Sequence, residues 1–469
     1  MAQNFIACDR EQELLLPPSL REWLPEGHLA WFVLDAVGEM DLAAFYAGYR
    51  DDGWGRAAHD PAMMVALFVY AYAIGVRSSR AIERRCCEDV AFRVITANHV
   101  PDHATIARFR VRHEAAIADL FGEVLALCTR SGLVEVGVVA VDGTKIAAAA
   151  AHHATCSYEE IAREILQDAA RIDAAEDELF GEARGDELPE GLRTSGDRRR
   201  VLRAAKQALE AERAAEAMKI PRDRGERLVE CERRLRQDWE LERHVVGEHA
   251  KWHAAGIASD GSRRMVGARH NIKPYPLTPQ PAGKINVTDP DSRNLKTTRG
   301  WVQGYNAQAV VGEGQIVLAA EISTESLDTA SLQPMVETAL HELARAGVTE
   351  TPGVVLADAG YWKNDAIDVL VAQGIPTLVA PDADRRKEPR PGRRGGLYDF
   401  ARRVLATDWG KELYLRRQGI VEPVFGQVKS NRGADRFLRR GRSAVRSEWR
   451  LLTATHNLLK LHRHQLAAA

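Results

Sequence analysis

Two aspartates stand in matching contexts that suit metal-dependent chemistry on phosphate. Asp142 follows the apolar run GVVAV and Asp358 follows VVLA, and glycine or alanine comes directly after each. Both runs predict buried strands with the aspartate at the carboxyl end, where ligands gather in open α/β sheets. One such aspartate is more often a turn or a helix cap, but two in matching contexts favour a shared site.

A third carboxylate, Glu422, lies in the sequence IVEPVFGQVKSNRG. Pro423 suits an initial helical position, where its missing N–H costs nothing. Lys429 and Arg436 follow at intervals of seven residues, which predicts that all three charged residues share one helical face. A phosphate backbone could approach such a face and have its charge neutralised there. The alternative is a solvated Glu–Lys helix.

Three converging carboxylates meet the needs of phosphodiester cleavage or transfer. Two magnesium ions about 4 Å apart activate an oxygen nucleophile and stabilise the leaving oxygen. Magnesium prefers carboxylate oxygens and keeps several waters. We therefore predict Asp142, Asp358 and Glu422 as catalytic and metal-binding residues, with two Mg²⁺ (or Mn²⁺) ions as cofactor.

The elements around these residues predict an α/β fold with a ribonuclease H-like mixed sheet and flanking helices. The order is strand, hairpin, helix, strand, helix, strand, helix, and it includes a hairpin at 301–323 and a last helix at 443–464. An all-helical domain precedes the sheet and a helical insertion interrupts it. The expected boundaries are 1–132 for an N-terminal DNA-binding domain, 133–150 with 296–469 for the catalytic domain, and 151–295 for the insertion, which is partly coiled coil and ends in a loop.

The N-terminal domain is predicted to hold three main helices after residue 11. They begin near Pro61, near Ser79, and after Asp102, a candidate cap for a helix that runs to Gly132. Arg108 and Arg110 lie early in the third helix, which suits entry into a DNA groove. Helices with some arginine are also common in proteins that touch no DNA.

The insertion changes in composition along its length. Residues 157–250 are rich in Ala, Glu, Arg and Leu at helical spacing and predict two or three long helices, with a coiled-coil hairpin as one arrangement. Residues 254–299 are polar and contain Pro and Gly, so a loop is expected. Asp289 and Asp291 in that loop suit a turn better than a metal or DNA contact.

The clustering of charged residues along the sequence is more informative about a nucleic-acid partner than the net charge. The net charge of −2 neither supports nor excludes a nucleic-acid partner. Basic residues cluster at 384–403 and again further on, and such clusters can bind phosphate or simply face solvent. The later cluster consists of Arg432, Arg436, Arg439, Arg440, Arg442 and Arg446.

Cysteine spacing and hydropathy favour a cytoplasmic protein without a membrane partner. The six cysteines form no CxxC pair, which argues against a zinc ribbon or a disulfide framework. The N-terminal residues do not resemble a signal peptide. The most apolar stretch, 63–76, is too short to span a bilayer.

The motifs together resemble those of bacterial insertion-sequence DDE transposases, a group with an InsH-type N-terminal domain. The resemblance rests on DPAMMVALFVYAYAIGVRSSRAIERR and PDHATIARFR, and then on VDGTKI, TDPDSRNLKTTRGWVQGYNAQAVV, LADAGYW and VEPVFGQVKSNRG. It implies a metal-binding triad at Asp142, Asp358 and Glu422. The family's Tyr–Arg–Glu–Lys signature falls on Tyr414, Arg417, Glu422 and Lys429. The gap between Arg417 and Glu422 is one residue longer than usual, and the neighbouring Arg416 is kept as an alternative.

The resemblance implies an enzyme that binds the terminal inverted repeats of its element, nicks DNA and joins the freed 3′-hydroxyl to target DNA. Its partners would be double-stranded DNA and at least a second copy in the synaptic complex, at the bacterial nucleoid. DNA would be held by Tyr414, Arg417, Lys429, Arg432, Arg436, Arg108 and Arg110. Two alternatives stay open: a metal-dependent nuclease of the same fold, and a domesticated DNA-binding protein without catalysis.

Overall fold

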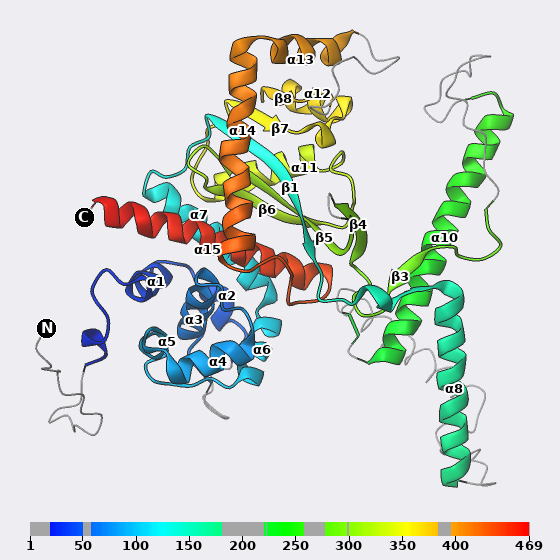
Figure 1. The fold of residues 1–469 in the computed structure, drawn as a ribbon, viewed down its shortest axis with the longest axis horizontal. Coiled ribbons are helices and arrows are strands. Elements are labelled where there is room, and N and C mark those ends of the chain that lie inside the picture. The colour runs from blue at the N-terminus through cyan, green and yellow to red at the C-terminus, as the bar shows by residue number, and fades with distance from the viewer. Residues whose placement is uncertain are drawn as a thin grey trace, which may run out of the picture.

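The computed structural model describes residues 19–49, 58–180, 220–221, 223–257, 277–297, 300–382 and 395–468 (Figure 1). Within these residues, six strands form one mixed sheet in the order β4-β5-β1-β7-β8, with β6 also paired to β5. The strands are β1 (Val138–Ala147), β4 (Arg293–Thr297), β5 (Gly300–Gly312), β6 (Val317–Ser323), β7 (Val354–Ala357) and β8 (Thr377–Val379). The chain is therefore a mixed α/β protein.

Strand directions follow from the pairing. β5 is antiparallel to β1, β4 and β6, whereas β7 is parallel to both β1 and β8. The hairpin expected at 301–323 is confirmed as β5 and β6. One expectation is wrong: Asp142 does not end its strand, because β1 continues to Ala147 along β5. The parallel pairing with β7 does end just before Asp142, at Val141 opposite Ala357.

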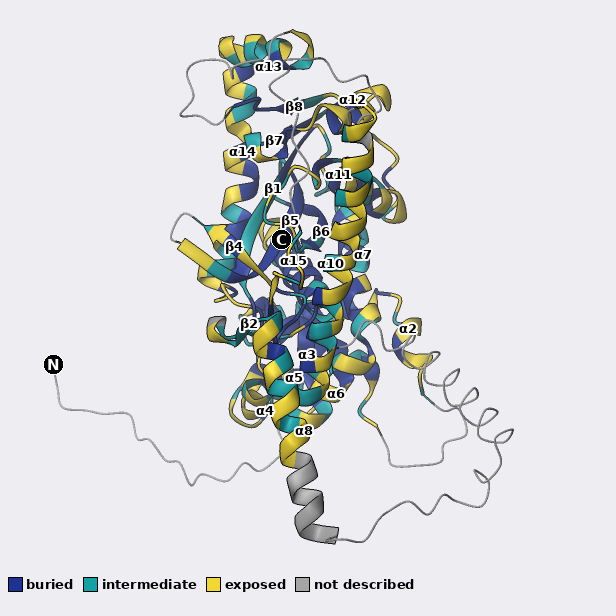
Figure 2. Ribbon diagram, turned by 90° about the vertical axis from the view of Figure 1, so that its right-hand side faces the viewer, coloured by how far each residue is buried: buried dark blue, intermediate teal, exposed yellow. Residues whose placement is uncertain are grey.

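Helices cover both faces of the sheet. Figure 2 shows α14 (Asp408–Gly426) on one face and α11 (Leu332–Arg345) on the other. The remaining helices of this part are α12 (Asn364–Ala372), α13 (Gly396–Ala406) and α15 (Arg442–Ala468). α14 packs on β1, β5 and β7, so it crosses the sheet where Asp142 and Asp358 lie.

Pro423 lies inside α14 and not at its start, which corrects the sequence-based placement. A proline at this position cannot donate to the carbonyl of Gly419, four residues earlier. The side-chain amide of Gln315, in the β5–β6 turn, donates to that carbonyl at 3.1 Å instead. The helix therefore tolerates Pro423 because the sheet supplies the missing hydrogen bond.

The N-terminal helices are shorter than expected. They are α1 (Leu29–Gly38), α2 (Ala43–Tyr46), α3 (Pro61–Ala73), α4 (Ser79–Glu88), α5 (Val90–Ile95), α6 (His103–Arg112) and α7 (Glu114–Arg130), after a 3₁₀ turn at Leu20–Glu22. The start at Pro61 and the cap at Asp102, which accepts from Thr105 N–H at 2.9 Å, are confirmed. Asp89 caps α5 and His113 separates α6 from α7, so two breaks were missed.

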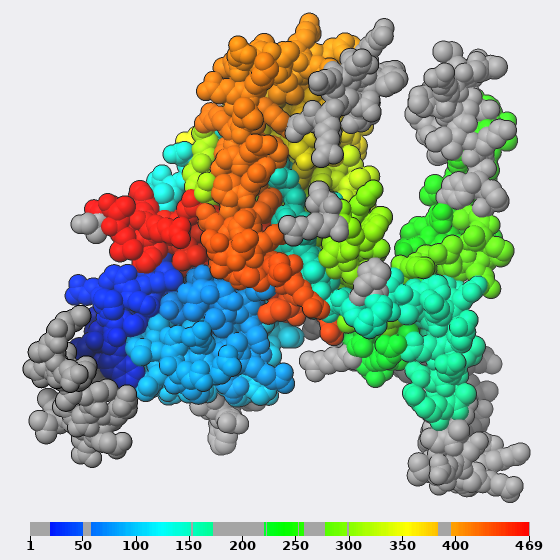
Figure 3. All heavy atoms as spheres, viewed as in Figure 1, coloured from blue at the N-terminus to red at the C-terminus, as the bar shows by residue number. Residues whose placement is uncertain are grey.

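α15 joins the N-terminal helices to the sheet. It packs on α7, α3 and β6, and one continuous apolar core runs through all of them. In the space-filling view these parts form a single body, while α8 (Tyr158–Phe180) and α10 (Arg224–Ala254) project at one side (Figure 3). The N-terminal helices are thus fixed relative to the sheet.

The insertion is built on a short two-stranded sheet. β2 (Thr155–Ser157) pairs with β3 (Lys284–Asn286), and a 3₁₀ turn at His152–Ala154 leads into it. A small apolar core holds α8 and α10 to this sheet, and it consists of Ile161, Leu228, Cys231, Leu235, Ile285 and Val287. The prediction of a loop at 254–299 is wrong where β3 and β4 lie. Residues 258–276 of that loop and residues 181–219 of the predicted helices lie outside the described residues.

None of the helices among the described residues is long and apolar enough to cross a membrane. The apolar helix α3 is buried along nearly its whole length.

Candidate active site

Asp142 and Asp358 are neighbours on adjacent parallel strands. Val141 lies opposite Ala357, so the two aspartates occupy the next position on β1 and directly after β7. Paired strands lie about 4.8 Å apart. Asp358 also caps a 3₁₀ turn (Ala359–Tyr361) by accepting from Gly360 N–H at 2.8 Å. The turn fixes its carboxylate beside that of Asp142.

The environment of Asp142 favours a bound cation. Burial raises the pKa of Asp142 to about 6, and the negative charges of Asp358 and Asp328 add to the rise. The positive charge of Arg417 and a hydrogen bond from Gly143 N–H act in the opposite direction. Concentrated negative charge in a partly desolvated place attracts a positive group.

Arg417 supplies that positive group in the structure. It extends from α14, is 8% exposed, and its Nη1 lies 2.8 Å from Oδ2 of Asp142. Burial alone would lower the pKa of Arg417, but the charges of Asp142, Asp358 and Glu422, with Tyr414, raise it overall. Arg416 points elsewhere and pairs with Glu313. The geometry therefore associates Arg417, and not Arg416, with the acids.

Glu422 is exposed and lies one to two turns beyond Arg417 on α14. Its charge is the smallest of those that raise the pKa of Arg417, and five residues along α14 turn it about 140° around the helix axis from Arg417. As the side chains stand, no three Asp, Glu, His or Cys residues of the described ranges enclose a metal position. The donors themselves fit a divalent cation, because Asp142 and Asp358 are hard oxygen ligands whose shared charge is balanced by one guanidinium.

Asp328, between β6 and α11, lies on the face of the sheet opposite Asp142 and was not singled out by the sequence analysis. Its Oδ1 accepts from Asn306 Nδ2 and from Gln308 Nε2, each at 2.7 Å. Asn306 and Gln308 lie on β5 opposite Lys145 and Gly143 of β1. A signal was present in YNAQAVV, where two amides alternate in an otherwise apolar strand and so face the same side of the sheet.

Two of the predicted phosphate ligands on the Glu422 segment contact the protein itself. Lys429 donates to Lys145 O at 2.9 Å, and burial lowers its pKa. Arg432 is buried, donates to Leu452 O and to Thr455 Oγ1, and has a pKa lowered by burial to about 10. The position of Arg432 argues against a phosphate contact.

Arg436 contradicts the predicted common helical face. α14 ends at Gly426, a π-helical turn covers Gln427–Asn431, and Arg436 lies beyond both. It forms a bridge to Ala147, and its side chain donates to Ala148 O at 3.1 Å.

The other C-terminal arginines are also used internally. Arg439 pairs with Glu114, Arg446 with Glu321, and Arg440 donates to Ala149 O. Of the earlier basic cluster, residues 383–394 lie outside the described residues. The predicted phosphate-binding cluster is therefore mainly a set of internal contacts.

On α6, Arg108 and Arg110 differ. Arg108 is exposed and, among the described residues, donates one hydrogen bond, to Thr105 Oγ1 of its own helix at 3.1 Å. Arg110 donates to Arg77 O at 3.0 Å, and its guanidinium lies 5.1 Å from the centre of the Phe68 ring. Of these two arginines, Arg108 is the one whose side chain is exposed. Tyr414 is half-buried, with Arg417 5.8 Å from its ring centre.

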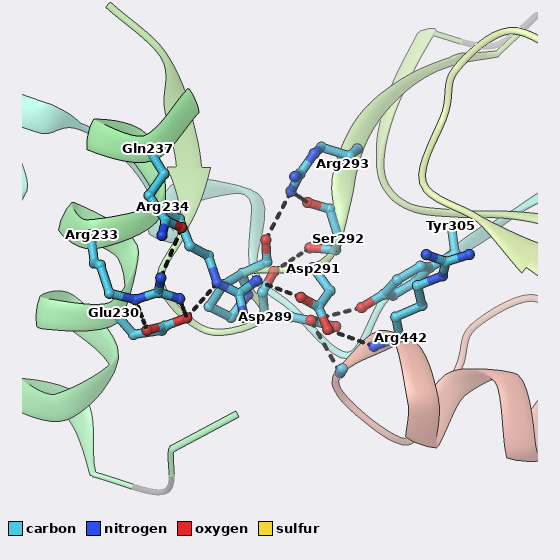
Figure 4. A network of polar contacts seen from close by, with 12 residues as sticks. Glu230, Arg233, Arg234, Gln237, Asp289, Asp291, Ser292, Arg293, Tyr305 and Arg442 are labelled. Carbon is cyan, nitrogen blue, oxygen red and sulfur yellow. Dashed lines mark hydrogen bonds and ion pairs between the residues drawn. The ribbon is translucent and has the colours of Figure 1, made fainter. Parts of the chain in front are cut away.

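Asp289 and Asp291 connect the insertion to the rest of the chain (Figure 4). Asp289 is fully buried and accepts from Tyr305 Oη at 2.8 Å and Gly441 N–H at 3.2 Å. Asp291 pairs with Arg234 of α10 and accepts from Arg442 N–H at 2.7 Å. Ser292 N–H closes a turn on Asp289 O, so a structural role fits better than metal or DNA binding.

Two family models match the chain. Residues 18–112 match a Transposase domain (DUF772), and residues 281–458 match a Transposase DDE domain. Together the two ranges cover more than half of the chain, and both describe proteins of DNA transposition. The chain belongs to the insertion-sequence DDE transposases. No curated protein and no solved structure matches it.

Proposed function

We propose that this chain binds the terminal inverted repeats of its insertion sequence, cleaves DNA there, and joins the freed 3′-hydroxyl to target DNA. One observation carries the proposal. The parallel pair β1–β7 brings Asp142 and Asp358 together under Arg417 of α14, and of these residues Asp358 and Arg417 lie within the range that matches a Transposase DDE domain. Glu422 follows on the same helix and completes a proposed triad of Asp142, Asp358 and Glu422.

A ribonuclease H-like fold for the sheet is part of the proposal. It is supported by the strand order β6-β5-β1-β7-β8, in which only β5 runs against the others. The proposed division into an N-terminal DNA-binding domain (1–132), a catalytic domain (133–150 and 296–469) and an insertion (151–295) needs one adjustment. β4 begins at Arg293 and pairs with β5, so the catalytic domain resumes a few residues earlier.

The proposed cofactor is a pair of Mg²⁺ or Mn²⁺ ions held by Asp142, Asp358 and Glu422. When bound, such ions make an oxygen nucleophile available at neutral pH and stabilise the leaving oxygen. Arg417 balances the charge of Asp142 until a cation or a phosphate is present. Arg417 and Glu422 both lie on α14, so a movement of this helix would move the guanidinium and the third acid together.

DNA contacts are proposed at groups that can reach solvent. Arg108 on α6 and Tyr414 on α14 are candidates, and Arg417 can reach a phosphate after it leaves Asp142. The proposed partners are double-stranded DNA at the element ends and target, and a second copy of the chain in the synaptic complex. We propose a cytoplasmic, nucleoid-associated location.

The test is cleavage and joining of a DNA fragment that carries the ends flanking this gene. The reaction is run with Mg²⁺, with EDTA, with Asp358→Asn, and with Asp365→Asn as a matched control that removes an exposed carboxylate at the start of α12. Cut and joined products that persist in the control and vanish with EDTA and Asp358→Asn would support a transposase. Cutting without joining would favour the nuclease, and binding without cutting would favour the DNA-binding protein.

A further inference from the structure

We propose that the hairpin of β4 and β5 is a binding site for single-stranded DNA, in which Trp301 stacks on an unpaired base and Lys296 meets a neighbouring phosphate. The inference rests on the proposed function for the presence of DNA near the acids. It concerns a part of the chain outside the proposed triad and outside α6. The residues that carry it lie where β4 (Arg293–Thr297) pairs with the start of β5.

Trp301 is an exposed aromatic side chain near the tip of this hairpin. It is 62% exposed. Within the part of the chain that the structure describes, no other ring, cation or hydrogen-bonding side chain contacts its indole. Covering the faces of an indole is favourable, so an indole left in water is available to a planar partner. A nucleobase is such a partner, and every base has a face on which an aromatic side chain can stack.

The hairpin carries positive charge and no acid. From Ser292 to Gly312 the sequence contains two arginines and Lys296, and neither aspartate nor glutamate. Lys296 lies directly opposite Trp301 in the antiparallel pair, which brings their Cβ atoms to about 5 Å from each other. Lys296 is exposed and forms no ion pair with the described residues. An aromatic ring beside a free cation suits a single strand of DNA, whose bases and phosphates alternate along the chain.

Trp301 and Lys296 lie on the face of the sheet that carries Asp142. Directly paired residues of antiparallel strands point to one face, and side chains alternate along each strand. Asp142 is paired with Ala309 of β5. Ala309 and Trp301 are eight residues apart, and this even number puts both on the same face. Figure 2 shows β4 on the same side of the sheet as α14, away from α11.

The distance along β5 suits a DNA strand that extends from the hairpin to the acids. Eight residues of a strand span about 27 Å, which is the length of about eight nucleotides along one strand of a duplex. A base inside a duplex is stacked on its neighbours and must leave that stack before it can lie on Trp301. The hairpin therefore favours a strand that has separated from its complement near the acids.

Trp409 shows which features set the hairpin apart from other exposed aromatic residues. It is 68% exposed near the start of α14. However, the exposed carboxylates of Asp408 and Glu412 lie on the same helix within three residues of it, and negative charge repels a phosphate backbone. Trp409 also lines an apolar pocket with Phe400. It therefore provides a matched control, with the same side chain and a similar exposure in an unsuitable charge environment.

The experiment measures binding of the full chain to a short labelled oligothymidine strand and to a labelled duplex by fluorescence anisotropy, in EDTA so that no DNA is cut. Trp301→Ala should weaken binding of the single strand about tenfold and leave duplex binding nearly unchanged. Trp301→Phe should retain most of the affinity because it keeps a ring. Lys296→Gln should lower the slope of log K against log salt by about 0.7. Trp409→Ala should bind as the wild type does.

The outcomes separate this inference from the proposed function. If the wild type cuts and joins element ends but Trp301→Ala binds the single strand as tightly as the wild type, the inference alone is overturned. It is also overturned if Trp301→Ala weakens single-strand and duplex binding equally, since the loss is then not one of stacking. A change in the association of two copies with unchanged DNA binding would make the hairpin a protein contact instead. If the wild type binds neither DNA, the proposed function and the inference both fail.

Discussion

Replacing Arg417 with methionine isolates the charge that balances Asp142. Methionine keeps most of the aliphatic length of arginine and removes the guanidinium that lies 2.8 Å from Oδ2 of Asp142. In the folded protein the pKa of Asp142 is about 6, above its ordinary value of 3.8. Asp142 is therefore ionised above pH 6 in the wild type, and only there does Arg417 stabilise it.

The size of the effect depends on pH. Breaking a buried ion pair costs about 3–5 kcal/mol if the remaining charge stays buried. The variant can avoid part of that cost by protonating Asp142, so the loss through this pair cannot exceed about 1.4 kcal/mol for each pH unit above 6. We expect a loss of about 3 kcal/mol at pH 8, about 1.4 kcal/mol at pH 7, and almost none at pH 5.

Urea unfolding of the full chain in EDTA, from pH 5 to pH 8, measures this loss. Arg416→Met is the matched control, since Arg416 pairs with Glu313 and its side chain is 48% exposed. Such a surface pair contributes at most about 1 kcal/mol. In an Asp142→Asn background, Arg417→Met should lose its pH dependence. Equal losses for the two arginine variants, or a loss for Arg417→Met that is the same at pH 5 and pH 8, would refute the reasoning.

Two further predictions concern residues outside the acidic site. Burial raises the pKa of Asp289 to about 6. Ionised Asp289 therefore lowers the free energy of unfolding by about 3 kcal/mol above pH 6, and this loss disappears as the pH falls toward 4. Urea unfolding of Asp289→Asn should lack that part of the wild-type pH dependence, and an unchanged dependence would contradict the burial argument. Arg108→Ala should weaken DNA binding and lower the slope of log K against log salt by about one. Arg110→Ala removes contacts to Arg77 and Phe68, so it should instead lower the unfolding midpoint. The reverse result would show that α6 meets DNA by another face.

The sheet was largely predictable from the sequence because its strands have simple local signals. The apolar runs before Asp142 and Asp358 and the hairpin around the Gly312–Gly314 turn gave the correct strands. β4, with the sequence RNLKT, has no apolar pattern and is a strand only because β5 pairs with it. Strand ends failed for the same reason: β1 continues past Asp142 along a partner more than 150 residues away in the sequence.

The sequence could relate site residues to one another only where they lie a few residues apart in the chain. Glu422 and Arg417 lie on one helix, and the helix carries Arg417 to Asp142. The face expected to join Glu422 to Arg436 failed because α14 ends at Gly426 and a π-helical turn follows it. The contacts of Asp328 could not be predicted from its own neighbours, since its partners Asn306 and Gln308 lie on strand β5.

The arginines show why composition alone was misleading about DNA contacts. Arg77 of the α3–α4 connection donates to the carbonyls of Gly433 and Arg436 and pairs with buried Glu448 of α15. Arg450 of α15 pairs with Glu342 of α11 and donates to Ala118 O of α7. Breaking such a buried pair is costly, and buried pairs can favour one arrangement over others. Arg77 and Arg450 therefore help to fix where the N-terminal helices lie relative to the sheet. Because that position is fixed, a DNA end bound at Arg108 would approach Asp142 along a path that the fold sets, and not one left to a flexible linker.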